Sequence, residues 1–359
     1  MGVILHVDMD AFYASVEAQR RGLEGEPLVV GVYSGRTEDS GAVSTCSYEA
    51  REIGIHAAMP IKTAKKKADN SDKEVSFVPM DKEYYDSFSD RIQEEILQER
   101  AEKIEKASID EFYIELKTEN YKQAENVAKE IQASIKEEFE VTCSIGVGPN
   151  KLVAKIASDR DKPEGLTKVK PEEVQEFMYG LEISDIHGIG DRTEEKLSER
   201  GIESVQELAE ADPALLVREF GEKQGLKLRE KARGEDDSEV EESQQKQVTR
   251  ITTLEENSRN SSKIKQVFPE LASDIIEKLE EENMDYGSVQ LIVIDTEIQM
   301  HTRSTSLKTR VRNNETLKEK GEKLLEEFLE ASNSTIRRVG LRASDLKKRK
   351  GQKSMEQFF

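Results

Sequence analysis

Two short acidic motifs at the ends of strand-like segments constrain this chain more than any other feature. VDMDAFY at residues 7–13 ends an apolar run, and ASIDEFY at residues 107–113 forms a turn between two strand-like segments. If the two strands are neighbours, Asp8, Asp110 and Glu111 converge on one point. Three carboxylates so close would repel one another unless cations lay between them. Oxygen ligands of this kind suit Mg²⁺, and two such ions about 3.5–4 Å apart can hold the attacking and leaving oxygens of a phosphoryl transfer.

Length and composition place the chain among multidomain cytoplasmic proteins. Its 359 residues predict two or three domains. The apolar run Val289–Ile294 has only the length of a strand, so we expect no membrane helix, and the start of the chain does not resemble a signal peptide. Cys46 and Cys143 lack the spacing of a zinc site, and two isolated cysteines favour a reducing compartment.

The charge distribution keeps nucleic acid open as a partner. A net charge of −20 argues against such binding, but residues 301–350 hold 14 Lys and Arg against 7 Asp and Glu. A basic patch on an acidic body can bind a phosphate backbone with an affinity that falls as salt rises. The acidic remainder would oppose non-specific binding.

The hydrophobic pattern predicts an α+β chain in three stretches. The first stretch is expected to contain strands at 3–8, 27–32, 42–45, 104–107, 112–116 and 141–147, with helices at 11–21, 48–53, 60–68, 83–103, 120–139 and 150–159. Short helices follow over 171–233, and then an acidic linker over 234–246 without apolar periodicity. The last stretch predicts a β-α-β-β-α-β ferredoxin-like unit, with elements at 247–255, 262–283, 288–295, 298–307, 314–330 and 335–344.

Further motifs accompany the acidic pair. They are SGRTEDSGAV at 34–43, YEAR at 48–51, GVGPNKLVAK at 146–155, KP at 162–163, GIG at 188–190 and NSRN at 257–260. Together with the acidic motifs, and in this order and spacing, they resemble the Y family of lesion-bypass DNA polymerases, in its archaeal branch of the DNA polymerase IV type. The resemblance runs over residues 3–346.

The resemblance implies a right-hand polymerase of the α+β class. Its expected parts are a ferredoxin-like palm (1–11 and 78–168), small fingers (12–77), a helical thumb with a helix-hairpin-helix (169–233), the acidic linker (234–246), a β-α-β-β-α-β little finger (247–346) and a flexible tail (347–359).

For the acidic motifs, the resemblance implies that two Mg²⁺ ions are held by Asp8, Asp110, Glu111 and the carbonyl of Met9. Strand alternation places Asp10 on the same side as Asp8. The resemblance nevertheless does not make Asp10 a direct ligand.

The resemblance also implies a nucleotide site. Tyr13 would lie against the sugar of the incoming nucleotide and exclude a 2′-hydroxyl. Tyr48 and Arg51, three residues apart and so on one helical face, would hold the triphosphate together with Lys162, and Thr45 would contact the dNTP. Small residues would roof the new base pair and leave room for a damaged base: Val32, Ala42, Ser44 and Ala58.

DNA contacts are expected from two regions. The glycines Gly188 and Gly190 would let backbone amides at a helix start approach a phosphate. In the little finger, residues on and beyond one strand are expected to put several arginines on one sheet face, and the last strand would add more: Arg303, Arg310, Arg312, Arg337, Arg338 and Arg342. The acidic linker over 234–246 departs from the family pattern. This linker is typically basic in archaeal relatives, and the negative linker of this chain is expected to repel DNA.

The tail is expected to bind a partner. The sequence QKSMEQFF at 352–359 fits the Q-x-x-hydrophobic-x-x-aromatic-aromatic peptide that binds sliding clamps of the PCNA type. Gln352, Met355, Phe358 and Phe359 are the positions that the pattern fixes.

The implied activity is low-fidelity, template-directed DNA synthesis past lesions by a monomer that uses primer-template DNA and dNTPs. We find no motif for a proofreading exonuclease. Two other classes remain: a nucleotidyl cyclase, which would need neither a thumb hairpin nor a little finger, and an inactive DNA-binding scaffold, which would not need three intact acids. Primer extension with Mg²⁺ would separate the three.

Overall fold

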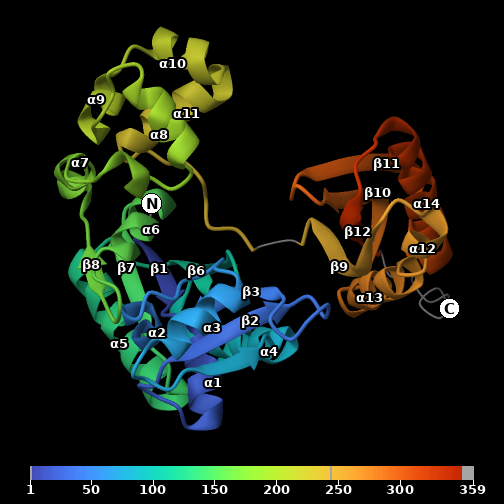
Figure 1. Ribbon diagram of the computed structural model, residues 1–359. Helices are drawn as coiled ribbons and strands as arrows, with labels where there is room; N and C mark the ends of the chain where they lie inside the picture. The colour runs from blue at the N-terminus through green and yellow to red at the C-terminus, as the bar shows by residue number, and fades with distance from the viewer. Residues whose placement is uncertain (1, 243–244, 350–359) are drawn as a thin grey trace, which may run out of the picture. The chain divides into compact units, whose positions relative to one another are not determined.

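The computed structural model describes residues 2–242 and 245–349 and mixes helices with sheets throughout. The described chain forms two compact units (Figure 1). The first comprises Met1–Val32 and Gly41–Ser243, and the second comprises Tyr33–Ser40 and Gln244–Phe359. The finer division into palm, fingers, thumb and little finger stays a prediction.

A five-stranded sheet organises the first unit. Its strand order is β5-β6-β1-β7-β8. The strands are β1 (Ile4–Met9), β5 (Lys103–Lys106), β6 (Glu111–Glu115), β7 (Cys143–Gly148) and β8 (Leu166–Lys168). β1 therefore lies in the centre, antiparallel to β6 on one side and to β7 on the other.

The two faces of β1 meet different partners. Leu5 and Val7 belong to the main core, which α1 (Phe12–Arg21), α4 (Lys82–Ile92) and α5 (Tyr121–Phe139) also build. His6, on the opposite face, contacts Ser158 of α6 (Lys151–Asp159) at 2.8 Å. Asp8 follows His6 by two residues, so strand alternation puts it on the α6 side as well.

A glycine lets α6 lie close to this sheet. Gly146 of β7 is paired with His6, and a Cβ atom at Gly146 would come within 1.9 Å of the Ala154 carbonyl oxygen. No other residue fits at that separation. The helix therefore covers the sheet face on which the acidic motif of β1 ends.

The chain after α4 differs from the predicted single helix over 83–103. The α-helix ends at Ile92 and continues as a π-helical turn, Gln93–Leu97, and a 3₁₀ turn, Gln98–Arg100. β5 begins at Lys103, which pairs with Glu115 of β6. Lys103, the last residue of the predicted helix, therefore belongs to strand β5.

A second, three-stranded sheet has the order β3-β2-β4. Its elements and the helices beside it in the sequence are β2 (Leu28–Tyr33), β3 (Gly41–Cys46), α2 (Tyr48–Glu52), α3 (Ile61–Asp69) and β4 (Ser76–Pro79). The sequence pattern did not predict β4 or β8, each of which pairs in parallel with a longer strand.

Short helices follow β8, as the sequence predicted. They are α7 (Val174–Tyr179), α8 (Asp191–Ser198), α9 (Val205–Glu210), α10 (Pro213–Phe220) and α11 (Glu222–Ala232). Met178, Leu197, Leu208 and Leu228 are among the buried residues that form their common core.

The first part of the acidic linker makes contacts with β1, β6 and α6. Val240 is 1% exposed and packs among residues of β1, β6 and α6. Asp236 Oδ2 accepts a hydrogen bond from the backbone N–H of Leu152 at 3.1 Å, at the start of α6. Within the first unit, Val240 and Asp236 thus attach this part of the linker to β1, β6 and α6. A single apolar residue produces no periodicity, so the sequence pattern could not show this.

The second unit has the predicted element order. Its elements are β9 (Gln247–Ser258), α12 (Ser261–Lys265), α13 (Phe268–Glu281), β10 (Met284–Asp295), β11 (Met300–Val311), α14 (Asn314–Ala331), β12 (Ile336–Ser344) and β13 (Lys347–Lys348). The predicted helix 262–283 is two helices, and Pro269 lies in the first turn of the second, where proline is tolerated.

The sheet of the second unit has the order β11-β10-β12-β9, and β13 pairs with β10. β12 lies between β9 and β10, the two strands that α12 and α13 connect, which is a split β-α-β arrangement. Among the described residues, no helix is long and apolar enough to cross a membrane.

Candidate functional site

The two acidic motifs meet on neighbouring strands. Asp8 at the end of β1 is paired with Glu111 at the start of β6, and on its other side with Ser144 of β7. The backbone N–H of Met9 donates to the carbonyl oxygen of Asp110 at 2.9 Å. The strand register thus brings both motifs to one edge of the sheet, as their positions at strand ends predicted.

Two lysines contact these acids. Lys162 Nζ lies 2.7 Å from Asp8 Oδ2, and Lys155 Nζ lies 2.6 Å from Glu111 Oε2. Asp110 accepts a hydrogen bond from Ser108 Oγ at 2.6 Å instead. Within residues 2–242 and 245–349, no three His, Cys, Asp or Glu side chains are arranged as a metal-binding group.

Burial and charge move the pKa values of Asp8 and Glu111 in opposite directions. Burial raises the pKa of Asp8 to about 6, and the ammonium of Lys162 only partly opposes this. The contacts with His6 and Lys155 lower the pKa of Glu111 to about 2. Burial lowers the pKa of His6 itself.

The donor atoms fit a hard divalent cation. The three carboxylates and the Met9 carbonyl are oxygen ligands of the kind that Mg²⁺ prefers. They lie at the ends of adjacent strands, and two of the acids already bind ammonium groups, which shows that this edge of the sheet attracts cations. The residues present therefore suit the group that the sequence implied.

Asp10 has a different set of partners. It is 2% exposed and accepts hydrogen bonds from Thr142 Oγ1 at 2.9 Å, Ser144 Oγ at 2.8 Å and the backbone N–H of Glu164 at 2.9 Å. Three donors leave this carboxylate little capacity for a metal. Its contacts agree with leaving Asp10 out of the ligand set.

Of the expected nucleotide residues, Lys162 contacts this edge directly. Lys162 reaches it from the loop after α6 and also binds Asp159 at 2.8 Å. On α2, the guanidinium carbon of Arg51 lies 4.5 Å from the centre of the Tyr48 ring. Burial raises the pKa of Tyr48, and the nearby charge of Asp10 raises it further.

The remaining nucleotide residues lie on the small sheet and on α1. Tyr13 is in the first turn of α1, and Thr45 is a partly buried residue of β3. The proposed roof residues come from neighbouring strands and a loop: Val32 from β2, Ala42 and Ser44 from β3, and Ala58 from the loop between α2 and α3. Val32, Ala42 and Ala58 are exposed, and Ser44 is partly buried.

The glycine motif of the predicted hairpin opens α8. Gly188 has a φ of 92°, in the left-handed region that favours glycine, and Gly190 is the N-cap of the helix. The carbonyl of His187 accepts a hydrogen bond from Lys231 Nζ of α11 at 2.5 Å. This contact fixes the hairpin loop against the last helix of the group.

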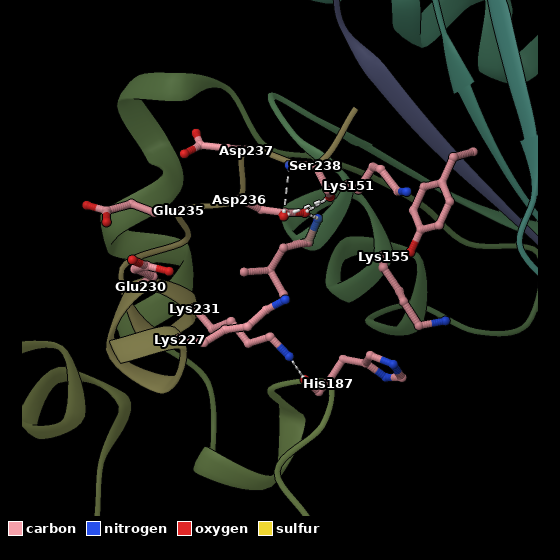
Figure 2. Close-up of a pocket in the computed structure, with 12 residues that line it drawn as sticks. Lys151, Lys155, His187, Lys227, Glu230, Lys231, Glu235, Asp236, Asp237 and Ser238 are labelled. Carbon is pink, nitrogen blue, oxygen red and sulfur yellow. Dashed lines mark hydrogen bonds between the residues drawn. The ribbon is translucent and has the colours of Figure 1, made fainter. Parts of the chain in front are cut away.

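A cavity of about 580 Å³ lies between this loop, α6, α11 and the docked linker (Figure 2). Its lining contains four lysines, Lys151, Lys155, Lys227 and Lys231, and three linker acids, Glu235, Asp236 and Asp237. The linker therefore places negative charge beside a group of lysines that includes Lys155, the partner of Glu111.

Lys155 contacts Glu111 at the site, and the sequence pattern did not predict a role for it. It lies in the GVGPNKLVAK motif, and its i,i+4 spacing from Lys151 puts both ammonium groups on one face of α6. Lys151 binds Glu105 of β5 at 2.7 Å and lies 4.7 Å from the centre of the Tyr113 ring. That shared face was the signal that could have identified them.

In the second unit, the sheet has one face covered by α13 and α14. Arg303 is paired with Leu291, a core residue, so it lies on the covered face. Arg342 is paired with Gln290, and Arg338 with Ile294, which puts both on the opposite face. Arg303 therefore does not share a face with Arg338 and Arg342.

Other arginines of this unit have partners within it. Arg310 binds Asp345 at 2.6 Å, and Arg312 donates to the Leu279 carbonyl at 3.2 Å. Arg342 Nε donates to Thr249 Oγ1 at 2.9 Å. Arg337 is a partly buried residue of β12. Such contacts orient the guanidinium groups within the unit.

Comparisons with known proteins cover nearly the whole chain. The model described as the impB/mucB/samB family matches residues 7–159, its C-terminal domain matches 245–356, and the model described as the DNA polymerase-iota thumb domain matches 184–236. The DNA polymerase IV of Methanosarcina acetivorans is 41% identical over 95% of this chain and 94% of its own length. This chain belongs to the Y family of DNA polymerases.

Other relatives and solved structures agree. The DNA polymerase IV of Saccharolobus solfataricus is 36% identical over 95% of this chain and 96% of its own length. The Y-family DNA polymerase chimera Dbh-Dpo4(243-245)-Dbh is 33% identical, with a TM-score of 0.87 over 96% of this chain and 98% of its own. An insertion ternary complex of Dbh DNA polymerase is also 33% identical, with a TM-score of 0.71 over 95% and 98%.

These similarities confirm the polymerase fold and the enzyme class. The chain is a DNA-directed DNA polymerase of the translesion type, and Y-family polymerases depend on metal ions. A nucleotidyl cyclase and an inactive scaffold are thereby excluded. The clamp-binding positions Gln352, Met355, Phe358 and Phe359 lie outside the described residues, so that motif stays a prediction.

Proposed function

We propose that this polymerase copies damaged DNA with low fidelity and uses two Mg²⁺ ions, which Asp8, Asp110, Glu111 and the Met9 carbonyl would hold. The observation that carries the proposal is the register that pairs Asp8 with Glu111 and bonds Met9 to Asp110. Four oxygen donors from two strands then lie at one edge of a buried sheet.

The chain's own residues would position the substrates. Bound ions would supply positive charge at the primer 3′-hydroxyl and at the triphosphate, which lowers the barrier to phosphoryl transfer. Lys162, Arg51 and Tyr48 would bind the triphosphate, so that the primer 3′-hydroxyl meets the α-phosphate in line and pyrophosphate leaves. Lys155 would keep the Glu111 carboxylate oriented and ionised, since their atoms lie 2.6 Å apart. Catalysis of this kind depends mainly on positioning and charge.

Selection would be strict for the sugar and lax for the base. Tyr13 would press against the sugar and exclude ribonucleotides, because a 2′-hydroxyl pressed against a ring loses its hydration. The slim side chains Val32, Ala42, Ser44 and Ala58 would form a roof that tolerates a distorted base pair. Three of these four are exposed, which supports an open site.

The wider partners would be primer-template DNA, dNTPs and a sliding clamp of the PCNA type, with the enzyme acting as a monomer. Gly188 and Gly190 would bring backbone amides to a phosphate. Arg338 and Arg342, on the open face of the second sheet, are the best placed of the predicted arginines for a phosphate backbone.

The test is primer extension with Mg²⁺. Asp8→Ala, Asp110→Ala and Glu111→Ala should each abolish extension and leave primer-template binding largely intact, because these acids make no phosphate contacts of their own. Asp72→Ala, in an exposed bend, removes an acid elsewhere and should retain the parental rate. Parental extension by the Asp110→Ala protein would contradict the metal assignment.

A further inference from the structure

The proposed sugar gate is backed by a second tyrosine. The rings of Tyr13 and Tyr85 stack with centroids 4.7 Å apart and an angle of 19° between their planes. Tyr13 is only partly buried, whereas Tyr85, on α4, is fully buried. One face of the gate ring is therefore covered by a ring that belongs to the protein interior.

Tyr85 is fixed at its hydroxyl end as well. Its Oη donates to Glu17 Oε1 at 2.9 Å, and Glu17 has no exposed surface. Glu17 lies four residues after Tyr13 on α1, so the carboxylate and the gate ring lie on one helical face. A buried carboxylate is costly unless it is paired, and Arg21 Nε supplies the partner at 2.5 Å from Glu17 Oε2.

A further contact joins the same two helices. Arg20 of α1 binds Asp81 at 2.9 Å, and its guanidinium carbon lies 4.3 Å from the centre of the Tyr84 ring. Asp81 caps α4 by accepting from the Tyr84 N–H at 3.3 Å. α1, which carries Tyr13, and α4, which carries Tyr85, are thus tied together at the stack and at this ion pair.

We propose that Tyr85, held by Glu17, is a positioning residue that sets the selection of deoxyribonucleotides over ribonucleotides by Tyr13. This inference rests on the proposed role of Tyr13. A steric gate discriminates only if its ring does not retreat when a 2′-hydroxyl presses on it. A stacked ring that is fully buried and hydrogen-bonded resists such movement, because neither a rotamer change nor a shift is available to it in a close-packed interior.

A purely structural role for Tyr85 predicts a different result. Loss of core packing alone would lower the efficiency of insertion of dNTP and rNTP by the same factor. Loss of the backing would raise rNTP insertion relative to dNTP insertion. The ratio of the two values of kcat/KM therefore separates the two roles.

The principal variant is Tyr85→Leu, which removes the stacked ring and keeps an apolar side chain. The dNTP-to-rNTP ratio of kcat/KM should fall by about threefold to tenfold, the factor that one aromatic pair typically contributes. Phe88→Leu is the matched control: Phe88 is a buried ring of the same helix that packs on Phe12. It should keep the parental ratio.

A graded series of 2′-substituents sharpens the test. With a yielding gate, the relative gain of Tyr85→Leu over the parent should increase from 2′-fluoro to 2′-hydroxyl to 2′-O-methyl nucleotides. Equal gains for all three would mean that the change is not steric and would overturn the proposal.

Two further variants separate the possible failures. Tyr13→Ala should lower the ratio more than Tyr85→Leu does; an unchanged ratio in Tyr13→Ala would refute the gate itself and, with it, this inference. A lowered ratio in Tyr13→Ala with a parental ratio in Tyr85→Leu would refute the role of Tyr85 alone. If Tyr85→Leu does not fold, Tyr85→Phe keeps the ring and removes the bond to Glu17. A ratio about twofold below the parent is then expected, a small hydrogen-bond effect, and a parental ratio overturns the proposal.

Discussion

Asp8, a proposed metal ligand, is predicted to lower the free energy of unfolding at neutral pH. The variant Asp8→Asn should show this effect. Burial raises the pKa of Asp8 from 3.8 to about 6. The folded state therefore binds the proton more tightly than the unfolded state does. The stabilisation by protonated Asp8 is complete below the pKa that Asp8 has in the unfolded chain. It is lost as the pH rises through the pKa that Asp8 has in the folded protein.

The size of the effect follows from the shift. About two pKa units correspond to ~3 kcal/mol between the two protonation states. Asparagine has the shape of the protonated acid and never ionises, so Asp8→Asn should be more stable than the parent by ~3 kcal/mol at pH 7.5. This difference in the free energy of unfolding between variant and parent should disappear as the pH falls from 6 to 4. Lys162 keeps a second carboxylate, Asp159, in the variant.

The assay is urea unfolding followed by circular dichroism from pH 4 to pH 8, with EDTA present to remove metal ions. Asp110→Asn is the matched control, because Asp110 belongs to the same site but is only partly buried. The free energy of unfolding of Asp110→Asn should stay close to that of the parent over this pH range. A stability gap for Asp8→Asn that does not change with pH would refute the reasoning. The variant should also fail to extend primers.

Three other predictions concern the linker and the tail. Glu235→Gln/Asp237→Asn removes two exposed acids beside the lysines and should tighten primer-template binding at low salt; superimposed salt titrations for parent and variant would show that DNA passes elsewhere. Val240→Ala removes two buried carbon atoms, a loss of ~1.6 kcal/mol, and should increase amide exchange in residues 236–242 about tenfold; unchanged exchange would contradict the docking. Phe358→Ala/Phe359→Ala should retain distributive synthesis and lose stimulation by the cognate clamp, and equal clamp binding by calorimetry would show that the tail is not the anchor.

The acidic site could be predicted because its geometry follows from strand ends. A run such as Val3–Val7 identifies a buried strand, and an acid just after it must lie at the sheet edge. What holds Asp10 could not be predicted, because its donors Thr142, Ser144 and Glu164 are more than a hundred residues away along the chain. Contacts of that kind depend on register, which one sequence does not encode locally.

The remaining features could not be predicted because they depend on which sheet face a residue occupies or on very short strands. Basic residues near the β11 strand suggested one binding face, but pairing with Leu291 places Arg303 on the covered side. Lys155 needed the additional knowledge that α6 covers the face of β1 that carries Asp8. β4 and β8 are held by parallel pairing with longer strands rather than by their own pattern.

The three hydrogen bonds of Asp10 have a consequence for nucleotide discrimination. They tie the end of β1 and a residue of β7 to Glu164, which lies two positions after Lys162. Lys162, which is proposed to bind the triphosphate, is thus fixed to the same frame as Asp8. The entropy cost of ordering that loop would then be met during folding and not at nucleotide binding. If Lys162 binds the triphosphate as proposed, this ordered site would hold an incorrect nucleotide as readily as a correct one, because the loop would have no closing motion to act as a checkpoint.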